Sequence, residues 1–157
     1  GFGVTPPTGL RFGAALAHGG YLGAGEAGSG GADHDATLMQ LEAEWAFGYT
    51  RLAGEWIRNV METPLADTVA QGGWAEVTQT LTPRLFLAAR ADAQRVRYED
   101  EPGVRIWESY KRFETVLGVR LTPDLTLRGG YMTRKGYVVS HWDDQIVMSI
   151  VWHRKVL

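Results

Sequence analysis

Residues 38–49 read LMQLEAEWAFGY, and side-chain polarity alternates along them almost without interruption. An α-helix would scatter the apolar and polar positions around its axis, whereas a β-strand places alternate residues on opposite faces. In a strand, one face carries Met39, Leu41, Ala43, Trp45, Phe47 and Tyr49, and the other carries Gln40, Glu42 and Glu44. The stretch therefore predicts a β-strand with one apolar and one polar face.

The same period of two recurs along most of the chain, and no helical period competes with it. Residues 1–8 contain adjacent prolines, which lack the donors of a strand ladder, so we expect a coil lead-in there. The pattern predicts eight strands in a single all-β domain spanning 1–157: Leu10 to His18, Leu38 to Tyr49, Leu52 to Met61, Trp74 to Leu81, Arg84 to Arg95, Trp107 to Leu121, Leu125 to Lys135 and Gln145 to His153.

The connections between these strands alternate in length. Short ones centre on Thr50, Thr82 and Thr122, and longer ones cover His18 to Ala36, Glu62 to Gly73, Arg97 to Ile106 and Gly136 to Asp143. The segment Leu81-Thr82-Pro83-Arg84-Leu85 is echoed by Leu121-Thr122-Pro123-Asp124-Leu125, which predicts the same hairpin turn twice. Alternating connections are typical of antiparallel transmembrane β-barrels, which have short periplasmic turns and longer outer loops.

Composition excludes several classes of function. The chain of 157 residues carries 16 Lys and Arg against 18 Asp and Glu, a net charge of −2 that offers no basic field for nucleic acid. The absence of cysteine excludes disulfides, thiolate metal sites and a cysteine nucleophile.

Three features favour lipid, rather than a protein core, on the apolar faces. Aromatic residues gather near strand ends, as the two interfaces of a bilayer favour: Trp45, Phe47 and Tyr49 near a short turn, and Trp74, Tyr98, Trp107, Tyr110, Tyr137 and Trp142 near the long loops. Small residues follow one another on one apolar face, as in the alanines after Leu87. Charges on the apolar faces, Arg95 and Lys111, lie far from the short turns, where they could snorkel to an outer rim.

The polar faces then have to line the interior of the barrel, because an arginine facing lipid at mid-depth costs about 2–4 kcal/mol. The lumen-facing candidates are Glu42, Glu44, Arg90, Asp92, Glu108, Arg112, Glu114, Arg120, Arg128 and Arg134. Arg120 and Arg128 flank one tight turn, so they repel each other unless a carboxylate or a bound anion lies nearby.

These features together resemble part of an outer-membrane porin of the broad phosphate-selective or uncharacterised class. The resemblance is carried by the two Leu-Thr-Pro-x-Leu turns, by the arginine-bearing strand after each, and by the run Gly13-Ala14-Ala15-Leu16-Ala17-His18-Gly19-Gly20-Tyr21. It implies passive diffusion of small hydrophilic solutes or ions through a water-filled lumen, a location in the outer membrane of a Gram-negative bacterium, and partners that are membrane lipid, further copies in a trimer, or other envelope proteins.

The sequence contains no recognisable catalytic or cofactor-binding motif, so we expect neither enzymatic activity nor a cofactor. Ser140 and His141 are neighbours, and neighbours on a strand point apart. Asp33-His34-Asp35 could offer carboxylate oxygens and an imidazole to a cation. Because it lies in a glycine-rich loop, we expect it to be a solvated loop tip, and we expect the glycines around it to form a flexible segment.

Three functional classes stay open. The strands could belong to a wide porin, or they could close by themselves into an eight-stranded barrel with a structural or anchoring role, since side chains fill a barrel of that size. A third possibility is a soluble lipocalin-like carrier with its apolar face turned inward.

Overall fold

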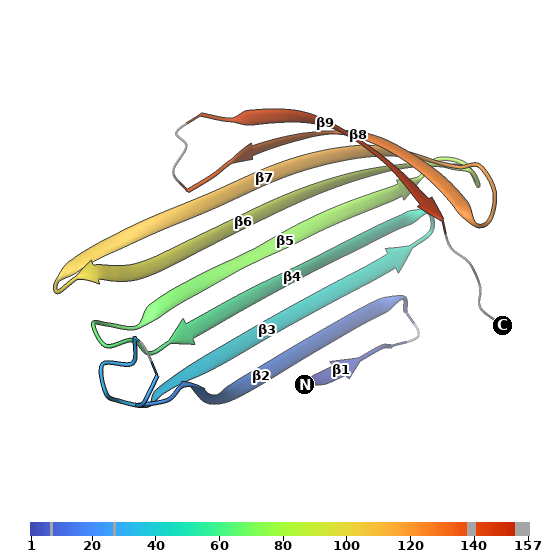
Figure 1. The fold of residues 1–157 in the computed structure, drawn as a ribbon. Helices are drawn as coiled ribbons and strands as arrows, with labels where there is room; N and C mark the ends of the chain where they lie inside the picture. The colour runs from blue at the N-terminus through green and yellow to red at the C-terminus, as the bar shows by residue number, and fades with distance from the viewer. Residues whose placement is uncertain (7, 27, 138–140, 153–157) are drawn as a thin grey trace.

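The computed structural model of the chain describes residues 1–6, 8–26, 28–137 and 141–152. Within these ranges it contains nine β-strands and no helix (Figure 1). Each strand pairs antiparallel with the next along the chain, so the sheet is an up-and-down meander. The strands are β1 (Phe2–Val4), β2 (Leu10–Leu22), β3 (His34–Phe47), β4 (Thr50–Met61), β5 (Thr68–Thr80), β6 (Leu85–Glu101), β7 (Val104–Arg120), β8 (Leu125–Lys135) and β9 (Asp143–Trp152).

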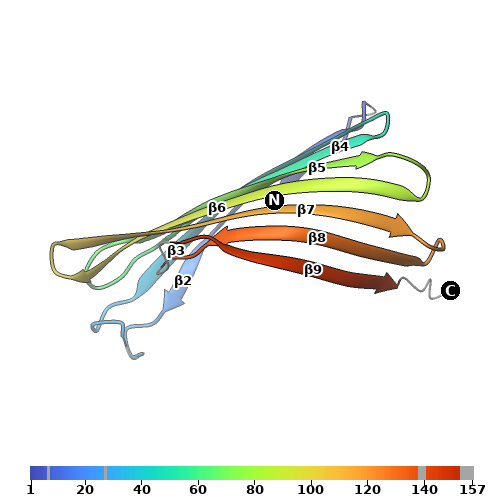
Figure 2. The same cartoon turned by 90° about the horizontal axis from the view of Figure 1, so that it is seen from above.

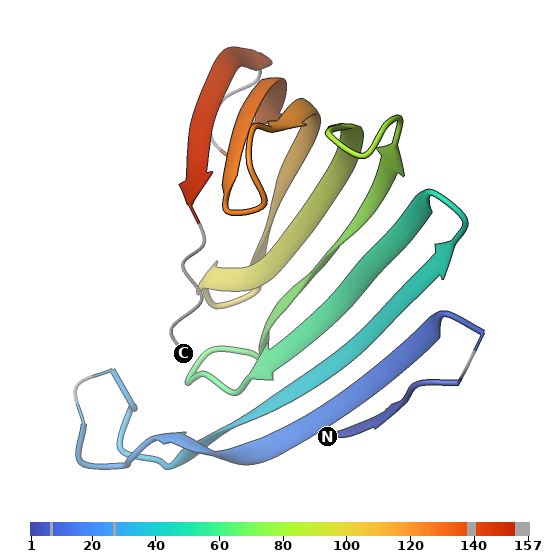
Figure 3. The ribbon, with the colours of Figure 1, turned by 90° about the vertical axis from the view of Figure 1, so that its right-hand side faces the viewer.

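The sheet is curved but open. Figure 2 shows its curvature, and the edge strands β1 and β9 lie at opposite ends of the sheet in Figures 1 and 3; no described residues pair them with each other. A sheet closes into a barrel only when its first and last strands hydrogen-bond. The expected all-β antiparallel architecture is therefore confirmed, but these strands do not form a closed barrel by themselves.

The strand count differs from the expected eight because the lead-in is not all coil. Phe2–Val4 forms β1, which pairs with residues 12–14 of β2. The adjacent prolines follow this short strand instead of interrupting it, so they remove no donor from the β1–β2 ladder.

The repeated turns have the same geometry, as their sequences predict. The Leu81 amide donates to the carbonyl of Leu85 at 2.9 Å, and the Leu121 amide donates to the carbonyl of Leu125 at 2.9 Å. In both turns the threonine hydroxyl accepts from the amide two residues later, at 3.3 Å. The threonine thus holds the turn that the proline shapes.

The predicted long loop from Arg97 to Ile106 is wrong. Strands β6 and β7 continue through most of it and leave only Pro102 and Gly103 between them. Gly103 has a positive φ of 83°, which tight hairpin turns require. The hairpin extends farther than its neighbours because pairing persists through a register shift between Glu99 and Glu101, which the polar composition of the segment conceals.

Strand β5 also begins earlier than expected, at Thr68, so part of the predicted link Glu62 to Gly73 is strand. The preceding strand β4 carries Glu55 on one face and Arg58 on the other, yet it pairs with β3 and β5 without a register shift. Arg58 lies toward the end of the strand near the long loops, beyond Leu52, Gly54 and Trp56 on the same face.

The sheet encloses almost no core of its own. Among the described residues, Phe86 is the only hydrophobic side chain that is buried, at 8% exposure. Large apolar side chains such as Leu16, Ile146 and Met148 are 66%, 84% and 78% exposed. The described residues include no helix long and apolar enough to span a membrane.

Candidate functional site

The register sorts the two faces of the sheet by polarity. All ten predicted polar-face residues lie on one face of the sheet. In the ladders that join β3 to β8, they fall on the set of alternate residues that point to this side. Side chains on this face are mostly half-buried, and those on the other face are mostly exposed. Converging side chains shield one another on the concave side of a curved sheet, so the polar face is the inner one.

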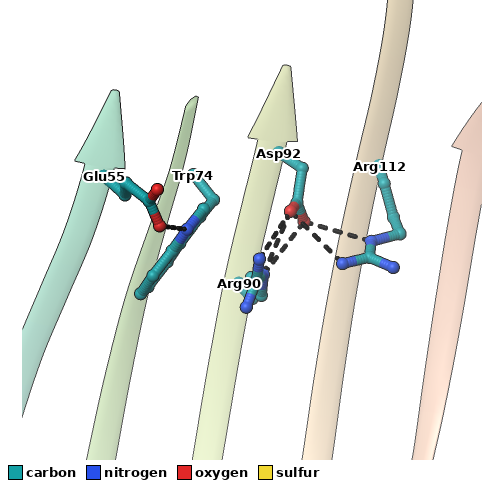
Figure 4. Close-up of polar contacts among 5 residues, drawn as sticks. All are labelled: Glu55, Trp74, Arg90, Asp92 and Arg112. Atoms are coloured by element: carbon teal, nitrogen blue, oxygen red, sulfur yellow. Dashed lines mark hydrogen bonds and ion pairs between the residues drawn. The ribbon is translucent and has the colours of Figure 1, made fainter. Parts of the chain in front are cut away.

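Asp92 is the centre of the polar face (Figure 4). Its carboxylate accepts from Arg90 on the same strand, with Nη2 to Oδ1 at 2.9 Å, and from Arg112 on β7, with Nε to Oδ2 at 3.1 Å. Only 15% of the Asp92 side chain is exposed. One carboxylate therefore holds two guanidinium groups, while Glu114, opposite Arg90, forms no ion pair with a described residue.

The cluster extends across three more strands. The guanidinium of Arg90 lies over the indole of Trp74 at 4.3 Å, and the Trp74 Nε1 donates to Glu55 Oε2 at 3.0 Å (Figure 4). The Gln40 amide donates to the other oxygen of Glu55 at 2.9 Å. A continuous polar network thus runs from β3 to β7, a row that we call the Asp92 network.

A second group of ion pairs lies on the polar face nearer the short turns. Arg51 donates to Glu44 at 2.8 Å and reaches Glu76 at 3.5 Å. Arg11 on β2 pairs with Glu42 at 3.0 Å. The predicted candidates Glu42 and Glu44 are therefore neutralised by arginines of adjacent strands.

Arg120 and Arg128 are held differently from the other arginines. Both lie over the ring of Phe86, at 5.0 Å and 5.8 Å, and Arg120 also donates to the carbonyl of Pro83 at 3.2 Å. Neither forms an ion pair with a described residue. Neutralisation of this pair by a neighbouring carboxylate is thus not found among the described residues, and both guanidinium groups contact the same aromatic ring instead.

Phe86 occupies its place because Gly118 lies directly across from it. A Cβ at Gly118 would collide with the Phe86 ring, which covers the glycine completely. This packing of an aromatic ring over a cross-strand glycine fixes the ring flat against the sheet.

The polar face is hollowed near the long loops. A groove of about 650 Å³ lies beside the Asp92 network and is lined by polar groups that include Asn59, Gln94 and Tyr110. Where the β6–β7 hairpin extends beyond the groove, Tyr98 donates to Glu108 at 3.0 Å, a bond that raises the pKa of Tyr98. Arg134 pairs with Asp143 at 3.1 Å on the same face.

The opposite face carries a broad band without a charged side chain. It crosses β2 to β9 from the short turns upward, and on β6 it runs from Leu85 to Ala93, about 27 Å along the strand. The first side chains above the band toward the long loops are His18, Thr37, Arg58, Gln71, Arg95, Lys111, Thr133 and Asp144. Arg95 and Lys111 thus lie at the end of the band, where their spacing predicted them.

The expected aromatic belt near the long loops is partly wrong. Trp74, Tyr98 and Tyr110 lie on the polar face, and Tyr137 contacts Tyr110 with ring centroids 6.2 Å apart. Trp107 does lie on the apolar face, and it is joined there by Trp56, which the sequence pattern did not single out. Proximity to a strand end does not specify which face a side chain lies on, because the face alternates from one residue of the strand to the next.

Asp33, His34 and Asp35 hold the loop after β2 in place. Asp33 accepts from the amide of Ala24 at 2.7 Å, and the buried His34 ring contacts the carbonyl of Ser29 at 2.6 Å. Asp35 lies 3.6 Å from His18. The three side chains face different partners, and the described residues contain no group that could hold a metal ion. These bonds join residues of the glycine-rich loop to one another, and its flexibility stays a prediction. Ser140 lies outside the described residues.

Sequence reasoning missed Phe86 and Gly118, did not place Glu55 on the polar face, and assigned Trp74 to an aromatic belt. Their partners lie on other strands, so only the register brings them together; the one local signal is an isolated glycine within an alternating strand. Comparison with family models, with characterised proteins and with solved structures gave no match.

Proposed function

We propose that this sheet forms part of the wall of an outer-membrane β-barrel whose interior lets small hydrophilic solutes or ions diffuse passively. The apolar face contacts lipid, and the polar face borders water. The nine strands are completed into a closed wall by further strands, whichever chain supplies them.

The charge-free apolar band carries this proposal. Soluble proteins rarely expose apolar patches larger than a few hundred Å², and here the band covers one face of eight strands. Its extent on β6, about 27 Å, is comparable with the apolar band of about 25 Å of outer-membrane barrels. A bilayer satisfies this face without any further protein layer.

The polar face supports the same orientation. It carries the Asp92 network and two further groups of ion pairs, and charged groups of this kind are costly to bury away from water. A soluble lipocalin-like carrier would need the opposite arrangement, with the apolar face on the inner side.

The anchoring alternative has less support. A small closed barrel would need β1 and β9 to pair, and the sheet of described residues is open. An open, gently curved sheet is more compatible with the wall of a wide barrel, in which a water-filled lumen conducts.

Conductance with a charge-reversed variant tests this function. Reconstituted into planar bilayers, the chain is expected to conduct, with Arg120 and Arg128 attracting anions because no described carboxylate pairs with them. The double variant Arg120→Glu and Arg128→Glu should raise the cation-to-anion permeability ratio several-fold, as measured by the reversal potential in a salt gradient.

The matched control is Arg95→Glu with Arg97→Glu, the same change on the apolar face, which should leave the reversal potential unchanged. Membrane insertion without conductance would favour the anchoring role. Conductance with the same reversal potential in both double variants would show that the polar face does not line the pore.

Accessibility of single cysteines tests the orientation of the loops. The chain has no cysteine, so Gly25→Cys in the loop after β2 and Asp124→Cys in the short turn after β7 each create a unique thiol. A membrane-impermeant maleimide added to intact cells should label position 25 and spare position 124, which becomes reactive after permeabilisation. Labelling of position 124 alone on intact cells would invert the assignment.

A further inference from the structure

Five basic side chains form a line on the apolar face, just beyond the charge-free band. We call them the basic rim: Arg58 on β4, Arg95 and Arg97 on β6, Lys111 on β7 and Lys135 on β8. They share one face because each belongs to the set of alternate residues that points to this side of the sheet. All five lie at the end of the sheet that carries the long loops.

The positive charges of the basic rim are not neutralised by carboxylates of the described residues. None of its five side chains forms an ion pair there. On the polar face, by contrast, Arg11, Arg51, Arg90, Arg112 and Arg134 each pair with a carboxylate. Two acidic side chains on the same face as the rim have other partners: Glu99 pairs with Arg105, and Asp144 is hydrogen-bonded to Tyr131 and Thr133.

Two like-charge contacts make the rim unfavourable without an anion. Lys111 and Lys135 are directly opposite each other in the β7–β8 ladder, and like charges in that position destabilise a sheet. Arg95 and Arg97 both lie over Trp107, with guanidinium carbons 4.2 Å and 5.7 Å from the ring centroid. A bound anion between these groups would remove the repulsion.

The position of Trp107 indicates the environment of the bound anion. Its side chain is 52% exposed on the apolar face, beyond Lys111 and Ser109 on β7. An exposed indole beside cations with apolar stems matches the headgroup level of a bilayer, where Trp is enriched and Lys and Arg snorkel. A guanidinium stacked on a ring by its face keeps its N–H edge free to bind phosphate oxygens.

We infer that the basic rim binds the phosphate groups of lipids in the membrane leaflet at the long-loop end of the sheet. This inference rests on the proposed insertion of the apolar band into a bilayer. The occupant is a lipid and not free phosphate, because the band directly below the rim offers a surface for acyl chains, and the hollow that Arg95 and Lys111 line is also lined by apolar side chains such as Trp56 and Phe113.

Lipid titration of the full chain in dodecyl maltoside micelles tests the rim. The probe is phosphatidic acid, with phosphatidylcholine and inorganic phosphate as the other arms. The triple variant Arg95→Gln, Lys111→Gln and Lys135→Gln should weaken binding of phosphatidic acid about 100-fold, since each basic side chain contributes a factor of about five at an anionic surface. The triple variant Arg11→Gln, Arg84→Gln and Arg134→Gln removes the same charge from positions outside the rim and should bind phosphatidic acid as the unmodified chain does.

Each result has a defined consequence. Equal weakening in both triple variants, or displacement of phosphatidic acid by equimolar inorganic phosphate, would overturn the rim as a lipid site. A chain that inserts into micelles but binds phosphatidic acid and phosphatidylcholine equally would overturn the rim inference alone. A chain that stays monodisperse in buffer without detergent would overturn the proposed function, and the rim with it.

Discussion

Arginine at position 89 is expected to prevent stable insertion of the sheet into a bilayer, whereas arginine at position 88 is not. The two alanines are adjacent on β6, at the middle of the band, but they face opposite sides. Ala89 lies between Val77 and Thr115 on the apolar face, so Ala89→Arg places a charge at mid-depth in lipid. The expected loss is about 2–4 kcal/mol of folding free energy.

The matched variant Ala88→Arg introduces the same side chain on the polar face, beside Thr78 and Val116. We expect a loss below about 1 kcal/mol there, as for an exposed substitution next to water. Urea titration of both variants in lipid vesicles, followed by tryptophan fluorescence, measures the difference. A larger loss at position 88 than at position 89 would mean that the apolar face is inside and would favour the soluble carrier.

Loss of the Asp92 carboxylate is expected to have the second largest effect. Asp92→Ala leaves Arg90 and Arg112 without their shared acceptor, in a position where only 15% of the Asp92 side chain is exposed. Hydrogen bonds to charged groups contribute about 1.5–3 kcal/mol, and partial exposure of the arginines reduces the effect, so we expect a loss of about 2 kcal/mol. Unfolding in urea measures it.

Asp143→Ala is the control, because it removes a carboxylate that also pairs with an arginine, Arg134, but is 50% exposed. An exposed pair contributes about 0–1 kcal/mol, so this variant should unfold close to the unmodified chain. Similar losses in both variants would indicate that Asp92 does not organise the polar face more than any surface ion pair does.

The alternation of polarity was sufficient to predict much of the fold and the membership of the polar face. A period of two is a local property, so each strand reveals its two faces without reference to its neighbours. All ten predicted polar-face residues consequently lie on one face, and the two Leu-Thr-Pro-x-Leu segments form equivalent turns. The expectation that they border water stays a prediction for the experiments above.

Strand ends and contacts between strands were less predictable. Polar composition made residues 97–106 resemble a loop, although cross-strand pairing extends the β6–β7 hairpin through them. The face of Glu55 follows from its pairing with Trp74, which its own strand does not reveal, and Gly118 was overlooked because its role is to make room for Phe86 on another strand. Such contacts depend on register, which few local signals determine.

By itself, then, the sequence determined that the chain forms antiparallel strands with one apolar and one polar face, because side-chain alternation is encoded residue by residue. Only the tertiary structure decided that Asp92 joins Arg90 to Arg112, that Arg120 and Arg128 both lie over the ring of Phe86, and that the nine strands leave an open sheet. Register and curvature arise from the pairing of whole strands, so residues distant in the chain become neighbours without any motif that marks them.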